Sequence, residues 1–407
     1  MRDRQNVWYL ARINSELFKK KHDIKYYDEA IHFASIRIEN SESAYNLNER
    51  GIIRESAHDL AGALEDYLKA AELEPDNVYV INNIADIYRM MRKDELAISY
   101  MEKALKLNFK EENVWVYSNM AKYYEHRGEH EKAWQYSLKQ LELNSGSIFL
   151  YKQLARQYKN AKKFEDAIAI YKKLGKSGDI SKVKMLTEIG DCYFDKDDFN
   201  EALKYYNKAL TVAKENTKKS NNAKYWEELM NVYECFGTNY LFMDSRAYAD
   251  KVIEYYEKCY EIATEHVPGE VDRISEALVE NCYEFKEYDK AKKYAKVYLD
   301  VLERDYGSVD GYLNDRRYLR VRAVNICFCY VALGEMELAE KYLKLSLEGY
   351  LCCHCEYNDC FEAYLIEGII CEIKGDKEGA KKCYEKSVEI NPDAGRSNRL
   401  LKRINEK

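Results

Sequence analysis

The sequence predicts an all-α fold, a solenoid of about ten stacked helical hairpins. The main observation is a repeat, because a small residue recurs along the first half of the chain at intervals of 33 to 36 residues. These residues are Ala30, Ala63, Ala97, Ala133, Ala167 and Ala202. A period of about 34 residues corresponds to two short helices that cannot bury their apolar faces alone, so neighbouring units must stack. Only three prolines in 407 residues, with 33% charged residues, fit helices with solvated outer faces.

The residues around each alanine keep the same register. With each unit numbered from the start of its first helix, position eight is small, and position eleven is a tyrosine in every unit but the first, which has Arg54. The residues at position eight are Gly51, Ala85, Ala121, Ala155 and Gly190. The alanine that closes each hairpin is followed four residues later by Tyr67, Met101, Ser137, Tyr171 or Tyr206. This spacing predicts an apolar stripe on the second helix, packed against small residues of the first.

These units resemble the tetratricopeptide repeat. Residues 62–77 and 201–210 carry the resemblance most plainly, and residues 375–394 repeat the second-helix pattern near the C-terminus. In that last segment the glycine, alanine, aromatic residue and proline of the family are Gly375, Ala380, Tyr384 and Pro392. Pro75 and Pro392 fit the role of ending a helix. The resemblance implies a right-handed superhelix and a binding or assembly module, but the family has many unrelated partners.

The repeat period divides the chain into three expected parts. Residues 1–220 form a regular array of about five to six units, 221–394 a longer-period array, and 395–407 a basic terminal helix that caps the solenoid. The period lengthens because the later closing alanines, Ala291, Ala339 and Ala380, lie 48 and 41 residues apart. We expect two insertions to cause this. Residues 238–248 lengthen a helix or form a protruding loop, and further along the chain either the helices are longer or loops such as residues 303–317 intrude.

Composition narrows the class of protein. A formal net charge of −7 argues against a general surface for nucleic acid or anionic membranes. The chain has no run of eighteen apolar residues, and charges are scattered through its first residues instead of following the order of a signal peptide. The twelve cysteines lack the regular spacing of a disulfide framework. We therefore expect a soluble cytoplasmic protein with reduced thiols.

Two short strings resemble zinc sites. His126 and His130 fit the H-x-x-E-H pattern of some zinc peptidases, but Gly128 is expected at a helix–helix turn, so the histidines would not share one helix face. The second string is a C-x-x-C cluster consisting of Cys352, Cys353, His354, Cys355 and Cys360. Because no second ligand pair follows, a thiol cluster without metal is the preferred interpretation. With no phosphate loop or nucleophile elbow, the sequence predicts no enzyme, cofactor or metal.

The candidate binding surface follows from the geometry of the family, in which first helices line the concave side. Position two of four successive units is aromatic, with Tyr45, Tyr79, Trp115 and Phe149. A recurring aromatic side chain there predicts a ladder for an extended peptide or a partner helix. Beside it are amides expected to bond a peptide backbone, Asn48, Asn82, Asn83 and Asn119, and cations expected to pair acidic groups, Lys122, Lys152 and Arg156. The alternative is that the aromatic residues pack between neighbouring hairpins.

Two other binding modes would use polar or charged groove positions in place of the aromatic residues. Chaperone-tail binders of the family use a carboxylate clamp, but Ile52 and Trp115 stand where the clamp needs polar or basic residues, which disfavours that mode. Groove positions of later units are acidic, namely Glu188, Asp191, Glu227, Glu228, Glu276 and Glu280. A basic or cationic partner could bind these residues. The alternative is that they only form a solvated helix face.

The sequence thus predicts a non-catalytic scaffold that binds a protein or peptide ligand, without nucleic acid or membrane. The alternatives are a peptide-sensing regulator and a repeat module of a larger multidomain protein. Neither the partner nor the oligomeric state follows from the sequence.

Overall fold

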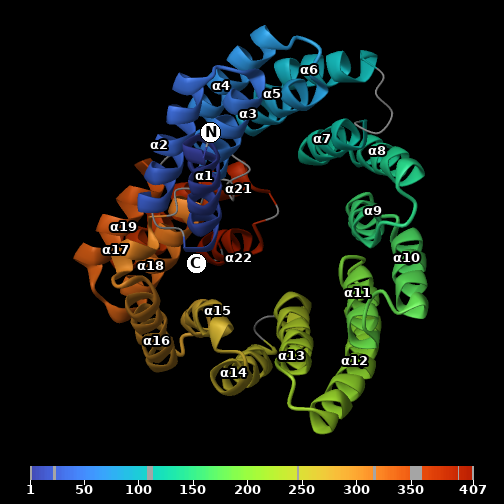
Figure 1. Cartoon of the computed structure of the whole chain (residues 1–407). Coiled ribbons are helices and arrows are strands. Elements are labelled where there is room, and N and C mark those ends of the chain that lie inside the picture. The colour runs from blue at the N-terminus through green and yellow to red at the C-terminus, as the bar shows by residue number, and fades with distance from the viewer. Residues whose placement is uncertain are drawn as a thin grey trace. The chain divides into compact units, whose positions relative to one another are not determined.

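The computed structural model describes residues 2–21, 24–107, 113–244, 247–314, 318–348, 360–392 and 394–405. These residues form helices joined by short turns, with no β-strand among them (Figure 1). The predicted all-α fold of paired, stacked helices is confirmed. The chain divides into two compact units, the first ending at Ile170 and the second beginning at Tyr171. The boundaries expected at residues 220 and 394 rest on the repeat period and stay predictions.

The first unit consists of hairpins whose helices follow one another directly in the chain. Its helices are α1 (Arg2–Lys21), α2 (Ile24–Asn40), α3 (Ala44–Ser56), α4 (Leu60–Leu73), α5 (Val78–Met90), α6 (Asp94–Lys106), α7 (Asn113–His126), α8 (His130–Leu143), α9 (Ile148–Asn160) and the first half of α10 (Phe164–Ser177). Helix α1 pairs with α2, α3 with α4, α5 with α6 and α7 with α8. Each hairpin also contacts the next, so the core of this unit is divided among small clusters along the stack.

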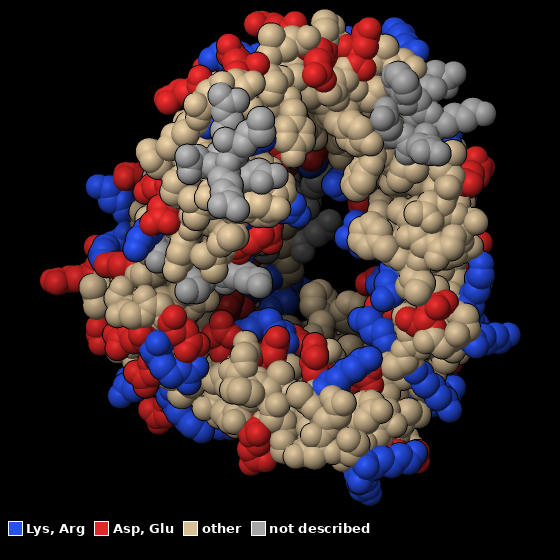
Figure 2. Space-filling model, viewed as in Figure 1, with Lys and Arg blue, Asp and Glu red and all other residues tan. Residues whose placement is uncertain are grey.

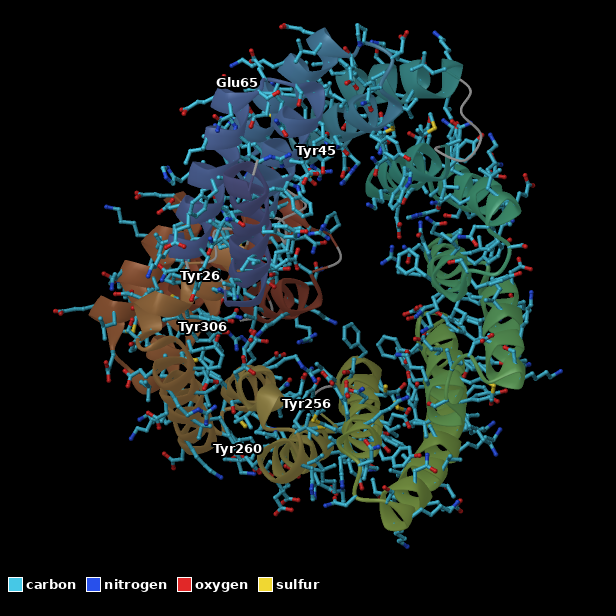
Figure 3. All side chains as sticks on the ribbon, in the orientation of Figure 1. Tyr26, Tyr45, Glu65, Tyr256, Tyr260 and Tyr306 are labelled. Carbon is cyan, nitrogen blue, oxygen red and sulfur yellow. The ribbon has the colours of Figure 1, made fainter. Side chains whose placement is uncertain are left out.

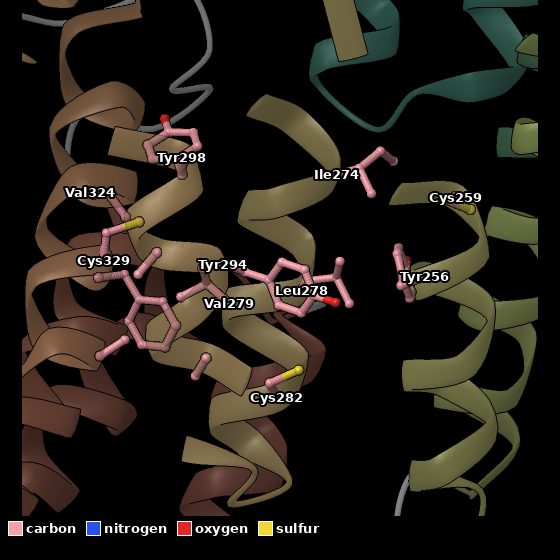
Figure 4. Packing of buried hydrophobic residues seen from close by; sticks show 14 of the residues in the cluster. Tyr256, Cys259, Ile274, Leu278, Val279, Cys282, Tyr294, Tyr298, Val324 and Cys329 are labelled. Carbon is pink, nitrogen blue, oxygen red and sulfur yellow. The ribbon is translucent and has the colours of Figure 1, made fainter. Parts of the chain in front are cut away.

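The second unit repeats the same arrangement with longer helices. It contains α11 (Lys182–Phe194), α12 (Phe199–Lys219), α13 (Ala223–Asp244), α14 (Ala249–His266), the 3₁₀-helix η1 (Pro268–Glu270), α15 (Val271–Glu284), α16 (Tyr288–Tyr306), α17 (Val309–Tyr312), α18 (Leu319–Leu333), α19 (Met336–Glu348), α20 (Phe361–Ile373), α21 (Lys377–Ile390) and α22 (Gly395–Asn405). Most of its buried apolar residues form one continuous cluster, part of which Figure 4 shows from α14 to α18. Helices α4 and α21 end just before Pro75 and Pro392, as predicted.

Close contact between the two helices of a hairpin depends on the glycine at position eight. A Cβ atom on Gly51, Gly190 or Gly368 would overlap the ring of a tyrosine on the second helix. These tyrosines are Tyr67, Tyr206 and Tyr384, and each is buried. Each hydroxyl donates a hydrogen bond to a carboxylate of the first helix, with distances of 2.8 Å to Glu55, 2.8 Å to Asp191 and 2.9 Å to Glu372. In these three hairpins, glycine therefore leaves the space against the first helix that the tyrosine ring occupies.

The two expected insertions are largely helical. Residues 238–244 belong to α13, so this stretch lengthens a helix. In the described part of residues 303–317, α16 continues to Tyr306 and the short helix α17 follows, which agrees with the alternative of longer helices. The physical reason is that Val309 and Leu313 are buried, while the Ser308 hydroxyl accepts a hydrogen bond from the Gly311 amide and caps α17.

The charged side chains are distributed over the surface. Lys and Arg side chains alternate with Asp and Glu side chains on the face seen in Figure 2. Among the described residues, no helix combines the length and the apolarity that crossing a bilayer requires.

The glycine–tyrosine contact leads to a stability prediction. We expect Gly51→Ala to lower the free energy of unfolding by about 1–3 kcal/mol, because the new methyl group must displace the Tyr67 ring. Urea unfolding of the full chain, followed by circular dichroism, measures this change. Gly146→Ala is the control, since no atom lies within 4 Å of the added Cβ atom. Equal stability of both variants would show that the hairpin tolerates the methyl group and that the contact does not set the helix separation.

Candidate functional site

Four aromatic side chains occupy the first turn of successive first helices in the first unit. The side chains of Ser43, Asn77 and Ser147 accept hydrogen bonds from first-turn backbone N–H groups and fix where α3, α5 and α9 begin. The aromatic residue follows two positions after each of these caps, and Trp115 is the third residue of α7. The cap therefore sets the direction in which the aromatic side chain leaves the helix.

All four aromatic side chains are exposed to solvent. The exposed fractions are 55% for Tyr45, 52% for Tyr79, 60% for Trp115 and 71% for Phe149. The alternative in which they pack between neighbouring hairpins does not agree with these values. Tyr45 lies on the opposite side of the α3–α4 hairpin from Glu65, a residue of the second helix (Figure 3). We call these four residues the aromatic row.

A pocket adjoins the first member of the aromatic row. Its volume is about 300 Å³, and it is lined by Tyr45 and Glu49 of α3 together with Trp8 and Arg12 of α1. The guanidinium carbon of Arg37 on α2 lies 5.6 Å from the centre of the Tyr45 ring, within the range of a cation–π contact. The repeat pattern did not indicate this contribution of α1 and α2, because both helices precede the first numbered repeat, which begins with α3.

The asparagines beside the row bond one another between repeats. The Asn83 amide nitrogen donates to the Asn48 side-chain oxygen at 2.9 Å, and the Asn119 amide nitrogen donates to the Asn82 side-chain oxygen at 3.1 Å. Asn82 and Asn119 are almost fully buried, so for these two the expected bond to a peptide backbone is replaced by a bond inside the protein. Asn48 and Asn83 are half-buried and border the row. The two pairs fix the spacing of α3, α5 and α7.

The predicted basic residues lie at the other end of the row. Lys122, Lys152 and Arg156 are exposed. An Arg156 guanidinium nitrogen lies 3.3 Å from a carboxylate oxygen of Glu125 on the preceding first helix, and Asn160 donates a hydrogen bond of 2.8 Å to the same carboxylate. An exposed ion pair of this kind contributes little to stability. Lys122 and Lys152 form no ion pair with a residue that the structure describes, so both ammonium groups are open to a ligand.

The acidic groove positions of the second unit do not form one solvated face. Glu188 lies 3.0 Å from the Lys184 ammonium group, and Asp191 accepts the Tyr206 hydrogen bond described above. Glu276 and Glu280 line a pocket between α15, α18 and α20. Glu227 is exposed and Glu228 is half-buried. Carboxylates at equivalent positions therefore have different surroundings.

Neither zinc string forms a metal site among the described residues. Helix α7 ends at His126 and α8 begins at His130, with Gly128 between them at a φ of 71°, so the two histidines belong to different helices. Cys352, Cys353, His354 and Cys355 lie outside the described residues, and Cys360 is buried at the start of α20. No group of three or more His, Cys, Asp or Glu side chains in the described part of the chain is arranged to hold a metal ion.

Comparisons with known proteins agree with the helical-repeat architecture. Models of the tetratricopeptide repeat match residues 78–111, 183–216 and 361–394, which correspond to the hairpins α5–α6, α11–α12 and α20–α21. No curated protein matches the sequence. Paired helices of this length, stacked in order along the chain, define a helical-repeat protein. The chain therefore contains tetratricopeptide repeats, which generally serve as scaffolds for binding other proteins.

Several solved structures are similar in fold. A tetratricopeptide repeat protein from Parabacteroides merdae is 17% identical with a TM-score of 0.42, and the match covers 64% of this chain and 98% of that chain. PilW, a type IV pilus biogenesis factor, is 18% identical with a TM-score of 0.41, covering 55% of this chain and 97% of that chain. YrrB, described as having an unusual peptide-binding site, is 19% identical with a TM-score of 0.35, covering 44% and 91%. At these identities and TM-scores, nothing about the function of this chain follows from the likeness.

The asparagine pairs lead to a second prediction. We expect Asn119→Ala to lower the free energy of unfolding by about 1–3 kcal/mol, because the buried Asn82 amide loses its partner. Thermal and urea unfolding of the full chain measure the change. The control Asn40→Ala removes an exposed amide at the end of α2 and is expected to change the free energy by less than about 0.5 kcal/mol. A similar small effect of both substitutions would mean that the pair does not hold the repeats together.

Proposed function

We propose that the first unit binds an extended segment of a partner protein along the aromatic row. The observation that carries this proposal is the exposure of Tyr45, Tyr79, Trp115 and Phe149 at the same position of four successive first helices. Large aromatic side chains that remain more than half exposed are enriched where proteins bind other proteins, and they supply most of the binding energy at such surfaces. A single exposed tyrosine would need no explanation, but a row with the period of the fold does.

The chemistry around the row suggests what the segment contains. Aromatic or aliphatic side chains of the segment would pack on the rings, and an acidic group would pair with Lys122 or Lys152 at the far end. Asn48 and Asn83 offer amide groups to the backbone of the segment between these contacts. Asn82 and Asn119 take no part in binding and act through the spacing of the helices.

The proposed role is non-catalytic and belongs to the cytoplasm. The nine cysteines that the structure describes are free thiols, and several of them are buried in the core as small apolar side chains. Free thiols in this number are typical of a reducing compartment. This supports the location without depending on the ligand.

The experiment compares the wild-type chain with the double variant Tyr79→Ala/Trp115→Ala. Affinity capture from a cell lysate identifies a bound protein, and its binding segment, made as a labelled peptide, is then titrated by fluorescence anisotropy. We expect the double variant to bind at least about 100-fold more weakly, since each central aromatic contact contributes about 2 kcal/mol. The circular dichroism spectrum should stay the same because both side chains are exposed.

The matched control is Leu73→Ala/Leu143→Ala. These two leucines are exposed by 52% and 45% on the second helices α4 and α8 of the same unit, so the control removes apolar surface from the other side of the hairpins. Unchanged affinity of the control with lost affinity of the aromatic variant supports the row. Full affinity of the aromatic variant would refute it.

A further inference from the structure

Three glutamates lie along one face of α15 in the second unit. Glu276, Glu280 and Glu284 follow one another at intervals of four residues, which places their side chains on the same side of the helix. Two of the three hold arginines of the C-terminal helix α22. The Arg399 guanidinium binds Glu284 through two hydrogen bonds of 2.7 and 2.9 Å. Arg396 lies 3.2 Å from a carboxylate oxygen of Glu280 and donates a bond of 3.0 Å to its backbone oxygen.

The pKa of Glu284 reflects this pairing. Burial alone would raise it, but the Arg399 hydrogen bonds and the charges of Arg396, Arg399 and Arg403 outweigh burial and lower the pKa. The glutamate face of α15 therefore binds guanidinium groups already, using arginines that lie more than 110 residues further along the chain.

Glu276, unlike Glu280 and Glu284, binds no arginine of α22. Its side chain is half-buried, and its carboxyl group has no hydrogen bond or ion pair with a residue that the structure describes. Burial raises the pKa of Glu276 well above its ordinary value, and the charges of Glu280, Glu362 and Asp272 raise it further, while Arg273 opposes them. Protein surroundings make the ionised form of a carboxyl group costly when it has no partner. A cation beside Glu276 would stabilise the ionised form, so its binding would be favourable.

A cavity beside Glu276 has room for such a cation. Its volume is about 580 Å³, and its walls come from α15, α18, α20 and the start of α22. Three carboxyl groups line it, those of Glu276, Glu280 and Glu362, against one guanidinium group, that of Arg396. The rest of the lining combines the apolar side chains of Val321, Val324, Phe361, Leu365 and Ile366 with the polar side chains of Asn325, Asn391 and Ser397. Val324, labelled in Figure 4, belongs both to the core of the second unit and to the lining of the cavity, so this part of the wall is held in place by the core.

We propose that this cavity, the glutamate pocket, binds the head group of a lysine or arginine side chain from a basic segment of a partner protein. The carboxyl groups pair with the cationic head, as Glu280 and Glu284 do with the arginines of α22. The apolar wall packs against the methylene stem, which in these two residues is long and hydrophobic. This combination of a charged end and an apolar wall fits an amphipathic side chain better than an inorganic ion. The proposal is independent of the aromatic row.

The test uses the full chain and a fluorescein-labelled peptide of glycine and serine that carries three arginines. The same peptide with three citrullines has the same shape without the charge. Fluorescence anisotropy at low ionic strength should show binding of the arginine peptide only. We expect Glu276→Gln to weaken this binding about tenfold, the usual effect of removing a hydrogen bond between charged groups.

Matched variants separate the pocket from general charge attraction. Glu337→Gln makes the same change of charge at an exposed position on α19 and should alter the affinity less than about twofold. Asn325→Lys places an ammonium group in the wall of the pocket and should block the peptide, which gives a second test if Glu276→Gln does not fold. The variant Tyr79→Ala/Trp115→Ala should bind the arginine peptide normally, so failure of the aromatic row and failure of the pocket can be told apart.

Three results would overturn the proposal. Equal affinity of the wild-type chain and Glu276→Gln would exclude the pocket as the binding site. An equal loss in Glu337→Gln would show attraction to the net charge instead. Glu276-dependent binding of spermidine, without binding of the arginine peptide, would make the occupant a free polyamine and not a protein segment.

Discussion

The close contact between the two helices of each hairpin is the constraint on which the rest of the structure depends. A small residue at position eight lets the closing side chain of the second helix reach the first helix, and a tyrosine there also bonds a carboxylate across the hairpin. This contact fixes how the first helix is rotated about its own axis. Because the rotation is fixed, position two of each first helix always leaves the hairpin on the same side.

In the two units, the fixed rotation places side chains of different chemistry at the groove positions. In the first unit it brings four aromatic side chains to the surface in a row, with asparagine pairs setting the distance between repeats. In the second unit, groove positions carry carboxylates, and α15 binds arginines of α22 through Glu280 and Glu284. We therefore propose a separate binding surface on each unit, one for apolar segments with acidic groups and one for basic side chains.

The repeat was predictable because its signal is local. The nine alanines that close hairpins in the sequence, from Ala30 to Ala380, are all fully buried, and helix ends at Pro75 and Pro392 follow from the missing N–H group of proline. The aromatic row was predictable for the same reason, since it needs only the repeat number of each residue.

Contacts between distant residues could not be predicted in this way. The bond from Asn119 to Asn82 joins side chains 37 residues apart, and the pattern could not show that the two amides turn toward each other. The hydrogen bond from Arg399 to Glu284 joins residues 115 positions apart, with other hairpins between them in the sequence. The helix α17 depended on the burial of Val309, which a segment rich in charges and glycine did not indicate.

Site-specific photocrosslinking tests the central claim most directly. A photoreactive phenylalanine analogue would replace Tyr79, Trp115 or, as the control, Leu73 on the second helix, and crosslinked peptides would be identified by mass spectrometry. The aromatic row predicts that positions 79 and 115 capture neighbouring residues of one partner segment, and that position 73 captures none of it. Capture of the same segment from position 73, or of unrelated proteins from positions 79 and 115, would contradict a binding surface on the first helices.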